Sequence, residues 1–359
     1  MPNTDRAGWL LAVLLLMPTS VWAQPTAPTQ RTYTDWFRDR DFFDPLIAEP
    51  RAPQIAFNFP MWAKEFEFSV EPGTRLVWEV ALGREIPIFT WANFDDVVMA
   101  KGAQGFGVWV DVSFHMIEDM GKDPSNPIVN TDYRFSLAKL KYYRVLSFTE
   151  SGTQRRWRSL ALRADLYHHE STHLGDEFVI NAQGAHPDFE RQNVSFEFYD
   201  ITGAYNWEGT GGLLHSIRGG TTGLVKPSHG YYSDHTLMYP APRPVLKSER
   251  NFEPYVQYEY HAPHRVREGR QQRWALFTSV DLRRRIVLDF NKPTADTKED
   301  TQWSINLLGG VRSWKGFQRF VIKEIYGRVY HGVNPHGQLR NQKDYWQAGV
   351  GVNFAVGDR

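Results

Sequence analysis

The chain has 359 residues with 41 basic and 41 acidic side chains, and it contains no cysteine. A formal net charge of zero without a basic stripe argues against nucleic acid as a partner. The lack of cysteine excludes disulfides and cysteine-liganded zinc as the means of stabilising an exported fold. Aromatic residues make up 14% of the chain, a share that the interfacial girdles of a membrane β-barrel would explain.

Residues 1–23 have the composition of a cleaved export signal. Arg6 supplies the positive charge, Leu10 to Met17 form the apolar core, and Val21 to Ala23 provide a cleavage site. The apolar core is shorter than the roughly 20 residues of a spanning helix, and no later stretch reaches that length. Residues 24–52, which mix aromatic and charged side chains, are predicted to form an N-terminal extension, either a short helix or a plug.

Residues 53–359 repeatedly alternate apolar and polar side chains, which is typical of β-strands. The clearest stretch runs from Phe106 to Phe114, where every second residue is Phe or Val. Together with the export signal and an apolar strand around Phe354, the pattern predicts an all-β fold, an antiparallel transmembrane β-barrel of about 12 strands. A soluble periplasmic β-domain is the alternative, since its strands alternate in the same way.

Connections of unequal length separate these strands. A membrane barrel has short turns at one end and long loops at the other, so the long connections are expected at a single end. The candidate long loops are Ile117 to Asp132, Gly175 to Glu190, Pro227 to Arg250, Asn291 to Asp300 and Gly332 to Asp344.

The stretch from Tyr167 to Glu177 reads Y-H-H-E-S-T-H-L-G-D-E and concentrates residues capable of catalysis. On a strand His169 and Ser171 share a face, so the imidazole can act as general base for the hydroxyl. The run resembles the catalytic strand of the outer-membrane phospholipase A family. That resemblance implies His169 as base, Ser171 as nucleophile and Asn193 as the group that orients the base. It also implies outer-membrane lipid as substrate.

The phospholipase family uses calcium, which makes Ca²⁺ the one candidate cofactor here, with Asp176 and Glu177 as candidate ligands. The family acts on lipid at the outer wall of its barrel. Counting alternate residues from the apolar side of the strand at Leu160 instead directs His169 and Ser171 into the lumen, unless a β-bulge shifts the face.

A second hypothesis treats residues 169–173 as H-E-x-x-H, the signature of a zinc peptidase. Its chemistry needs a helix, because only there do His169 and His173 lie one turn apart with Glu170 beside the metal-bound water. The surrounding strand pattern argues against such a helix.

A third hypothesis is a non-catalytic barrel, either a narrow pore or a structural protein with a polar lumen. Polar side chains of neighbouring strands would then satisfy one another inside the barrel. The network is predicted to consist of Arg163, Asp165, His173, Asp176, Glu177 and Glu197, together with the His169 and Ser171 pair.

Three segments carry a broader resemblance that extends over most of the mature chain. They are D-P-L-I-A-E-P-R from Asp44, N-T-D-Y-R from Asn130, and the stretch from Tyr167 to Glu177. The chain resembles an uncharacterised family of exported Gram-negative proteins, which has no assigned activity and often has Gln in place of Glu170. The export signal and the predicted barrel indicate location in the outer membrane of a Gram-negative bacterium, with the barrel-assembly machinery as a partner during export.

Overall fold

A computed structural model describes most of the predicted barrel. The described residues are 33–36, 48–50, 52–66, 69, 73–94, 101–121, 125–151, 154–186, 192–224, 230–233, 243–244, 252–262, 266–267, 270–271, 274–287, 301–313 and 321–355. The predicted export signal, residues 1–23, lies outside them, as does most of the predicted N-terminal extension.

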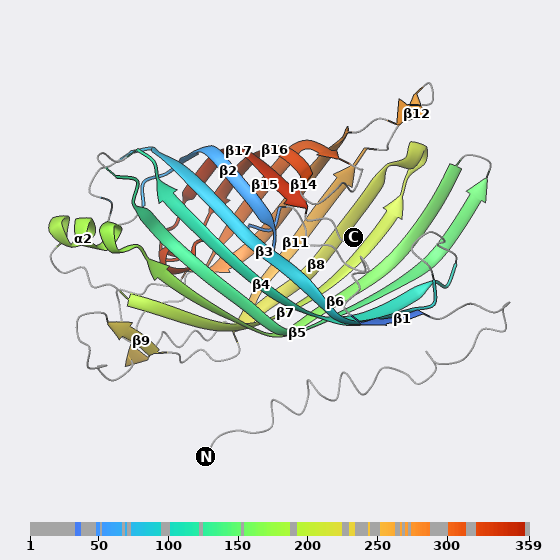
Figure 1. Ribbon diagram of the computed structural model, residues 1–359, viewed down its shortest axis with the longest axis horizontal. Helices are drawn as coiled ribbons and strands as arrows, with labels where there is room; N and C mark the ends of the chain where they lie inside the picture. The colour runs from blue at the N-terminus through green and yellow to red at the C-terminus, as the bar shows by residue number, and fades with distance from the viewer. Residues whose placement is uncertain are drawn as a thin grey trace, which may run out of the picture.

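Twelve antiparallel strands form a closed barrel (Figure 1). They are β2 (Ile55–Ala63), β3 (Arg75–Ala92), β4 (Gln104–Asp119), β5 (Ile128–Ser151), β6 (Gln154–Leu174), β7 (Gln192–Glu208), β8 (Leu214–Leu224), β11 (Phe252–His261), β14 (Trp274–Ile286), β15 (Thr301–Ser313), β16 (Val321–Gly332) and β17 (Tyr345–Ala355). Each strand pairs with the next along the chain, and β17 pairs with β2 to close the sheet. The predicted all-β barrel of about 12 strands is confirmed.

Short elements decorate this barrel. They are β1 (Tyr33–Trp36), β9 (Gly230–Ser233), β10 (Arg243–Pro244), β12 (Val266–Arg267), β13 (Arg270–Gln271), the helix α2 (Asp176–Ala185) and two 3-10 turns, η2 (Thr210–Gly212) and η3 (Gly337–Leu339). β1 pairs with the part of β3 that extends beyond β2, and β9 pairs with the start of β7. Among the described residues, no helix has the length and apolar character needed to cross a bilayer.

The barrel is polar inside and apolar outside, the reverse of a soluble protein. On β4, Asp111 is 0% and Ser113 is 3% exposed, whereas the neighbouring Val112 is 50% exposed. The same alternation runs around the barrel, with outward side chains such as Leu162, Ile217, Val256, Leu276, Trp303 and Val329 among the most exposed apolar residues. A soluble β-sandwich would bury these side chains in a core, so the pattern favours a wall that contacts lipid.

The two ends of the barrel differ. We call the end at which β2, β4, β6, β8, β14 and β16 finish the loop end. The five predicted long loops all fall on connections at this end, which also holds α2 and lies at the left of Figure 1. At the opposite end β5 and β6 are joined by a tight hairpin, Ser151 pairing with Gln154, and β2 begins beside the end of β17.

Two segments enter the lumen. Residues 48–50, within the predicted N-terminal extension, are buried there: the backbone N–H of Ala48 donates to Ser279 Oγ (3.3 Å), and Asn306 Nδ2 donates to its carbonyl (2.6 Å). The connection between β16 and β17 folds inward as well, and its Leu339 packs in an apolar cluster with Phe66 and Phe178. The interior is therefore largely filled by the chain itself.

Candidate functional site

Strand β6 changes face halfway along its length, and this decides where its catalytic candidates lie. Asp165 and His168 are both buried although they are three residues apart, and Ser136 and Lys139 of β5 repeat this spacing beside them. Two consecutive residues in each strand, 137–138 and 166–167, therefore lie on the outer side. The pairing of β6 with β7 shifts at the same place, between Asp165 and His168. Beyond this point the two faces of β6 are exchanged.

Because of this exchange, His169, Ser171 and His173 lie on the outer wall, alternating with the buried His168, Glu170 and Thr172. The expectation that His169 and Ser171 point into the lumen is wrong. The count of alternate residues from Leu160 is correct up to position 166 and reversed after it.

The outer wall carries a serine and a histidine in hydrogen-bonding contact. Ser171 Oγ lies 3.0 Å from His173 Nε2, the contact required between a nucleophile and its base. Tyr133 of β5 pairs with Ser171, and its ring meets the His173 ring edge-on with centroids 6.0 Å apart. The contact of Ser171 is thus with His173, two residues after it, whereas the resemblance implied His169, two residues before it.

The remaining candidates surround this pair. His169 pairs in register with Glu197 of β7, which is half-buried on the outer face. Ser171 pairs with Ser195 and Thr172 with Val194, so the backbone of Asn193 follows immediately on this pairing. The side chain of Asn193 lies outside the described part of the structure. Its predicted role in orienting the base stays a prediction.

The zinc-peptidase alternative lacks its geometry. Residues 169–173 belong to strand β6 rather than to a helix, and Glu170 is buried on the side opposite His169 and His173. The described residues contain no cluster of three His, Asp or Glu side chains placed to hold a metal ion.

Four members of the predicted lumen network lie elsewhere. His173 and Glu197 are on the outer wall because of the exchange of faces in β6 and the matching register of β7. Asp176 and Glu177 form the exposed first turn of α2, where acidic side chains complement the helix dipole. There Glu177 accepts a hydrogen bond from Ser125.

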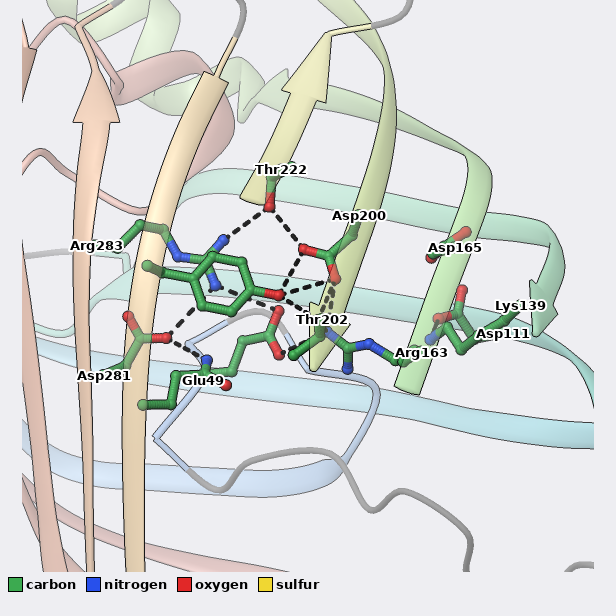
Figure 2. A network of polar contacts seen from close by, with 12 residues as sticks. Glu49, Asp111, Lys139, Arg163, Asp165, Asp200, Thr202, Thr222, Asp281 and Arg283 are labelled. Carbon is green, nitrogen blue, oxygen red and sulfur yellow. Dashed lines mark hydrogen bonds and ion pairs between the residues drawn. The ribbon is translucent and has the colours of Figure 1, made fainter. Parts of the chain in front are cut away.

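Arg163 and Asp165 do lie inside the barrel, and Asp200 of β7 connects Arg163 to a network there (Figure 2). The carboxylate of Asp200 accepts hydrogen bonds from Arg163 (2.9 Å), Thr202 (2.8 Å), Thr222 (2.8 Å) and the Tyr255 hydroxyl (2.9 Å). Four partners, three on other strands and one on β7 itself, are thereby tied to one buried acid by five hydrogen bonds, since the Tyr255 hydroxyl contacts both carboxylate oxygens.

Glu49, from the segment that enters the lumen, joins two arginines of this network. Its carboxylate lies 3.9 Å from Arg163 and 3.8 Å from Arg283, as Figure 2 shows. Arg283 also lies 3.5 Å from Asp281 and stacks over the Tyr255 ring at 4.2 Å from its centroid. The N-terminal segment is therefore held inside the barrel by charge.

A second group of charges lies beside it, on strands β3 to β6. Lys139 donates to Glu85 (2.7 Å) and to Asp111, and Lys141 also donates to Glu85. Ser136 Oγ donates to Asp165 (2.6 Å), and His168 lies 3.4 Å from the same carboxylate. Inside this barrel, ion pairs and hydrogen bonds between side chains hold the strands together, in place of an apolar core.

Sequence reasoning missed the members of the lumen network on β14 and in the N-terminal segment. The signal was present in β14, where Ser279, Asp281, Arg283 and Arg285 occupy alternate positions and are all buried. Glu49 gave no comparable signal, because its partners are more than 100 residues away along the chain.

Comparisons with known proteins identify the family of the chain. No curated protein and no solved structure matches the chain significantly. Residues 27–229, more than half of the chain, match a family described as a protein of unknown function, DUF1207. The matched region spans β1 to β8 and so includes the Ser171 and His173 pair. The chain belongs to the DUF1207 family.

Proposed function

We propose that the chain is an outer-membrane lipid-ester hydrolase that uses Ser171 as nucleophile and His173 as base. Its apolar outer wall and polar interior support insertion of the barrel into a membrane. Bacterial outer-membrane barrels carry their longer loops outside the cell, which directs the loop end outward. Export through the predicted signal and insertion by the barrel-assembly machinery belong to the same proposal.

The single observation that carries the hydrolase is the 3.0 Å contact between Ser171 and His173 on the outer wall. Polar side chains on a lipid-facing wall are unfavourable, and they therefore point to a function. Ser171 lies three residues before the end of β6, roughly 8 Å from that end for a tilted strand. This position suits the interfacial region, where lipid esters lie, better than the centre of the bilayer.

The pair supplies the two groups that ester cleavage needs. His173 takes the proton of the Ser171 hydroxyl as its oxygen attacks the acyl carbon, and then gives the proton to the leaving alcohol as the ester C–O bond breaks. Water then attacks the acyl carbon and gives a proton to His173, and the fatty acid leaves as the bond to the Ser171 oxygen breaks and His173 returns the proton to that oxygen. In this role Nε2 of His173 must be unprotonated, with the proton on Nδ1, and Asn193 is the candidate to hold it there.

The test is hydrolysis of a phospholipid by refolded mature protein in detergent micelles, with and without Ca²⁺. We expect S171A and H173A to lose at least about a hundredfold in rate, because each removes one of two interdependent groups. The matched control is T278A, which removes a hydroxyl from the outer wall of β14. H169A separates the two possible bases and should retain activity.

Full activity of S171A would refute the nucleophile, and activity of H173A with loss in H169A would return the base to His169. Wild-type protein that migrates as a folded barrel without hydrolysing any ester would refute the hydrolase. Stimulation by Ca²⁺ that disappears on neutralising Asp176 and Glu177 would identify these two acids as its ligands.

A further inference from the structure

A polar cavity lies inside the barrel near the loop end. The space in which the centre of a water-sized molecule fits is about 30 Å³, and the cavity opens to solvent. Arg340, from the connection between β16 and β17, lines it, as does Glu49 of the segment that enters the lumen. Arg340 donates to Glu253 and to the carbonyl of Ile286, the last residue of β14, and these contacts place Arg340 near the loop end.

The cavity has more positive than negative side chains. Four arginines line it, Arg134, Arg283, Arg285 and Arg340, against the three glutamates Glu49, Glu170 and Glu253. Three of the arginines have an acidic neighbour. Arg340 donates to Glu253, Arg283 lies 3.8 Å from Glu49, and Arg134 pairs in register with Glu170 on the adjacent strand.

Arg285 is the exception. It is 4% exposed, and its Nε is buried without a hydrogen-bond partner among the described residues, which is also true of the Arg283 Nε. What distinguishes Arg285 from Arg283 is the lack of a carboxylate in contact. Within that same part of the chain, no carboxylate lies within ion-pair distance of its guanidinium. The nearby Glu253 carboxylate interacts electrostatically with Arg285 but is already hydrogen-bonded by Arg340 and by the Ile286 N–H. A buried guanidinium with no carboxylate in direct contact is unfavourable, whereas one that faces a cavity can be satisfied by a bound anion.

We propose that this cavity binds a small oxyanion, with phosphate as its simplest representative, and that Arg285 is its principal contact. A guanidinium offers a planar pair of N–H donors that match two oxygens of a phosphate group. Arg340 and Arg283 border the same space and add positive potential. Because the barrel wall is closed, the anion is a soluble one that enters from the loop end rather than a lipid from the bilayer.

The first test measures binding of inorganic phosphate to the refolded full barrel in a non-ionic detergent, by calorimetry at constant ionic strength. We expect R285Q to weaken binding at least about tenfold, because it removes a charge-assisted pair of hydrogen bonds. The matched control is R284Q: Arg284 is the next residue on β14, half-buried on the outer side, where it donates to Thr301 Oγ1 (2.9 Å). This variant should bind phosphate as the wild type does.

Absence of phosphate binding to the wild type, or equal binding to R285Q and wild type, would overturn the proposal. So would binding that requires a phospholipid and is not reproduced by inorganic phosphate. S171A should bind phosphate normally, which keeps this outcome separate from that of the hydrolase.

A second measurement does not depend on whether R285Q folds. Phenylglyoxal modifies arginine side chains, and mass spectrometry of the digested wild type reports the rate at each position. Phosphate should slow modification of Arg285 several-fold and leave that of Arg284 unchanged. Equal rates at Arg285 with and without phosphate would contradict the assignment.

Discussion

Removal of the Asp200 carboxylate tests whether the lumen network holds the barrel together. In D200A, Arg163 loses its 2.9 Å partner inside the barrel, and Thr202, Thr222 and Tyr255 lose their common acceptor. Breaking a buried ion pair from one side costs about 3–5 kcal/mol, because the charge of Arg163 stays buried with only its longer contact to Glu49. We expect D200A to lower the free energy of unfolding by that amount.

Two further variants separate charge from shape. D200N keeps an acceptor of the same size, so we expect it to cost about 1–3 kcal/mol. The double variant R163M/D200L removes both charges and should be more stable than D200A, since replacing both partners by apolar groups can be nearly neutral. Glu49, 3.9 Å from Arg163, would then rely on Arg283 alone.

The assay is urea unfolding of protein refolded in lipid vesicles, followed by tryptophan fluorescence and by heat-modifiable migration. A shift of the midpoint without a change of slope reports stability. A cost below about 1 kcal/mol for D200A, or a double variant less stable than D200A, would refute the reasoning. Either result would mean that water in the lumen replaces the lost hydrogen bonds.

Two other predictions concern the wall and the lumen. Val256 is 52% exposed at the middle of β11, and V256R should cost about 2–4 kcal/mol in lipid vesicles but little in a detergent that adapts to the charge; equal effects in both would argue against a lipid-facing wall. Because the chain fills its lumen, planar bilayers with wild-type protein should show little conductance, and replacing residues 335–341 by a short glycine-serine turn should raise it; large wild-type channels would contradict the filled lumen.

The sequence predicts the barrel because alternation is a local property. In β4, the apolar Val112 and the polar Ser113 can each be assigned to a face of the sheet without knowledge of any other strand. Twelve strands of this kind leave few alternatives to a closed barrel. The five long loops were placed correctly at one end for the same reason, since strands that alternate in direction place every second connection at the same end. Pairing across the lumen is not local, and nothing near Glu49 in sequence predicts Arg163 and Arg283 as its neighbours.

The exchange of faces in β6 shows why the site was harder to place than the fold. The residue types at positions 164–168 do not indicate that two consecutive residues point outward. Leu166 suits the outer wall, and Tyr167 suits either side. The cause lies on the neighbouring strand. Asp165 reaches Ser136 and contacts His168, so both ends of the irregular stretch are fixed to the lumen.

The lumen and the outer-wall pair are therefore parts of one arrangement. With strict alternation from Asp165, residues 169, 171 and 173 would lie in the lumen and Glu170 and Thr172 would lie on the outer wall. The observed arrangement instead buries Thr172, which donates to Asn130 (3.1 Å), and Glu170, beside the cavity near the loop end. The same two-residue irregularity that satisfies these groups inside the barrel exposes Ser171 and His173 outside it. Packing of the lumen thus determines whether Ser171 and His173, the proposed catalytic pair, lie on the outer wall.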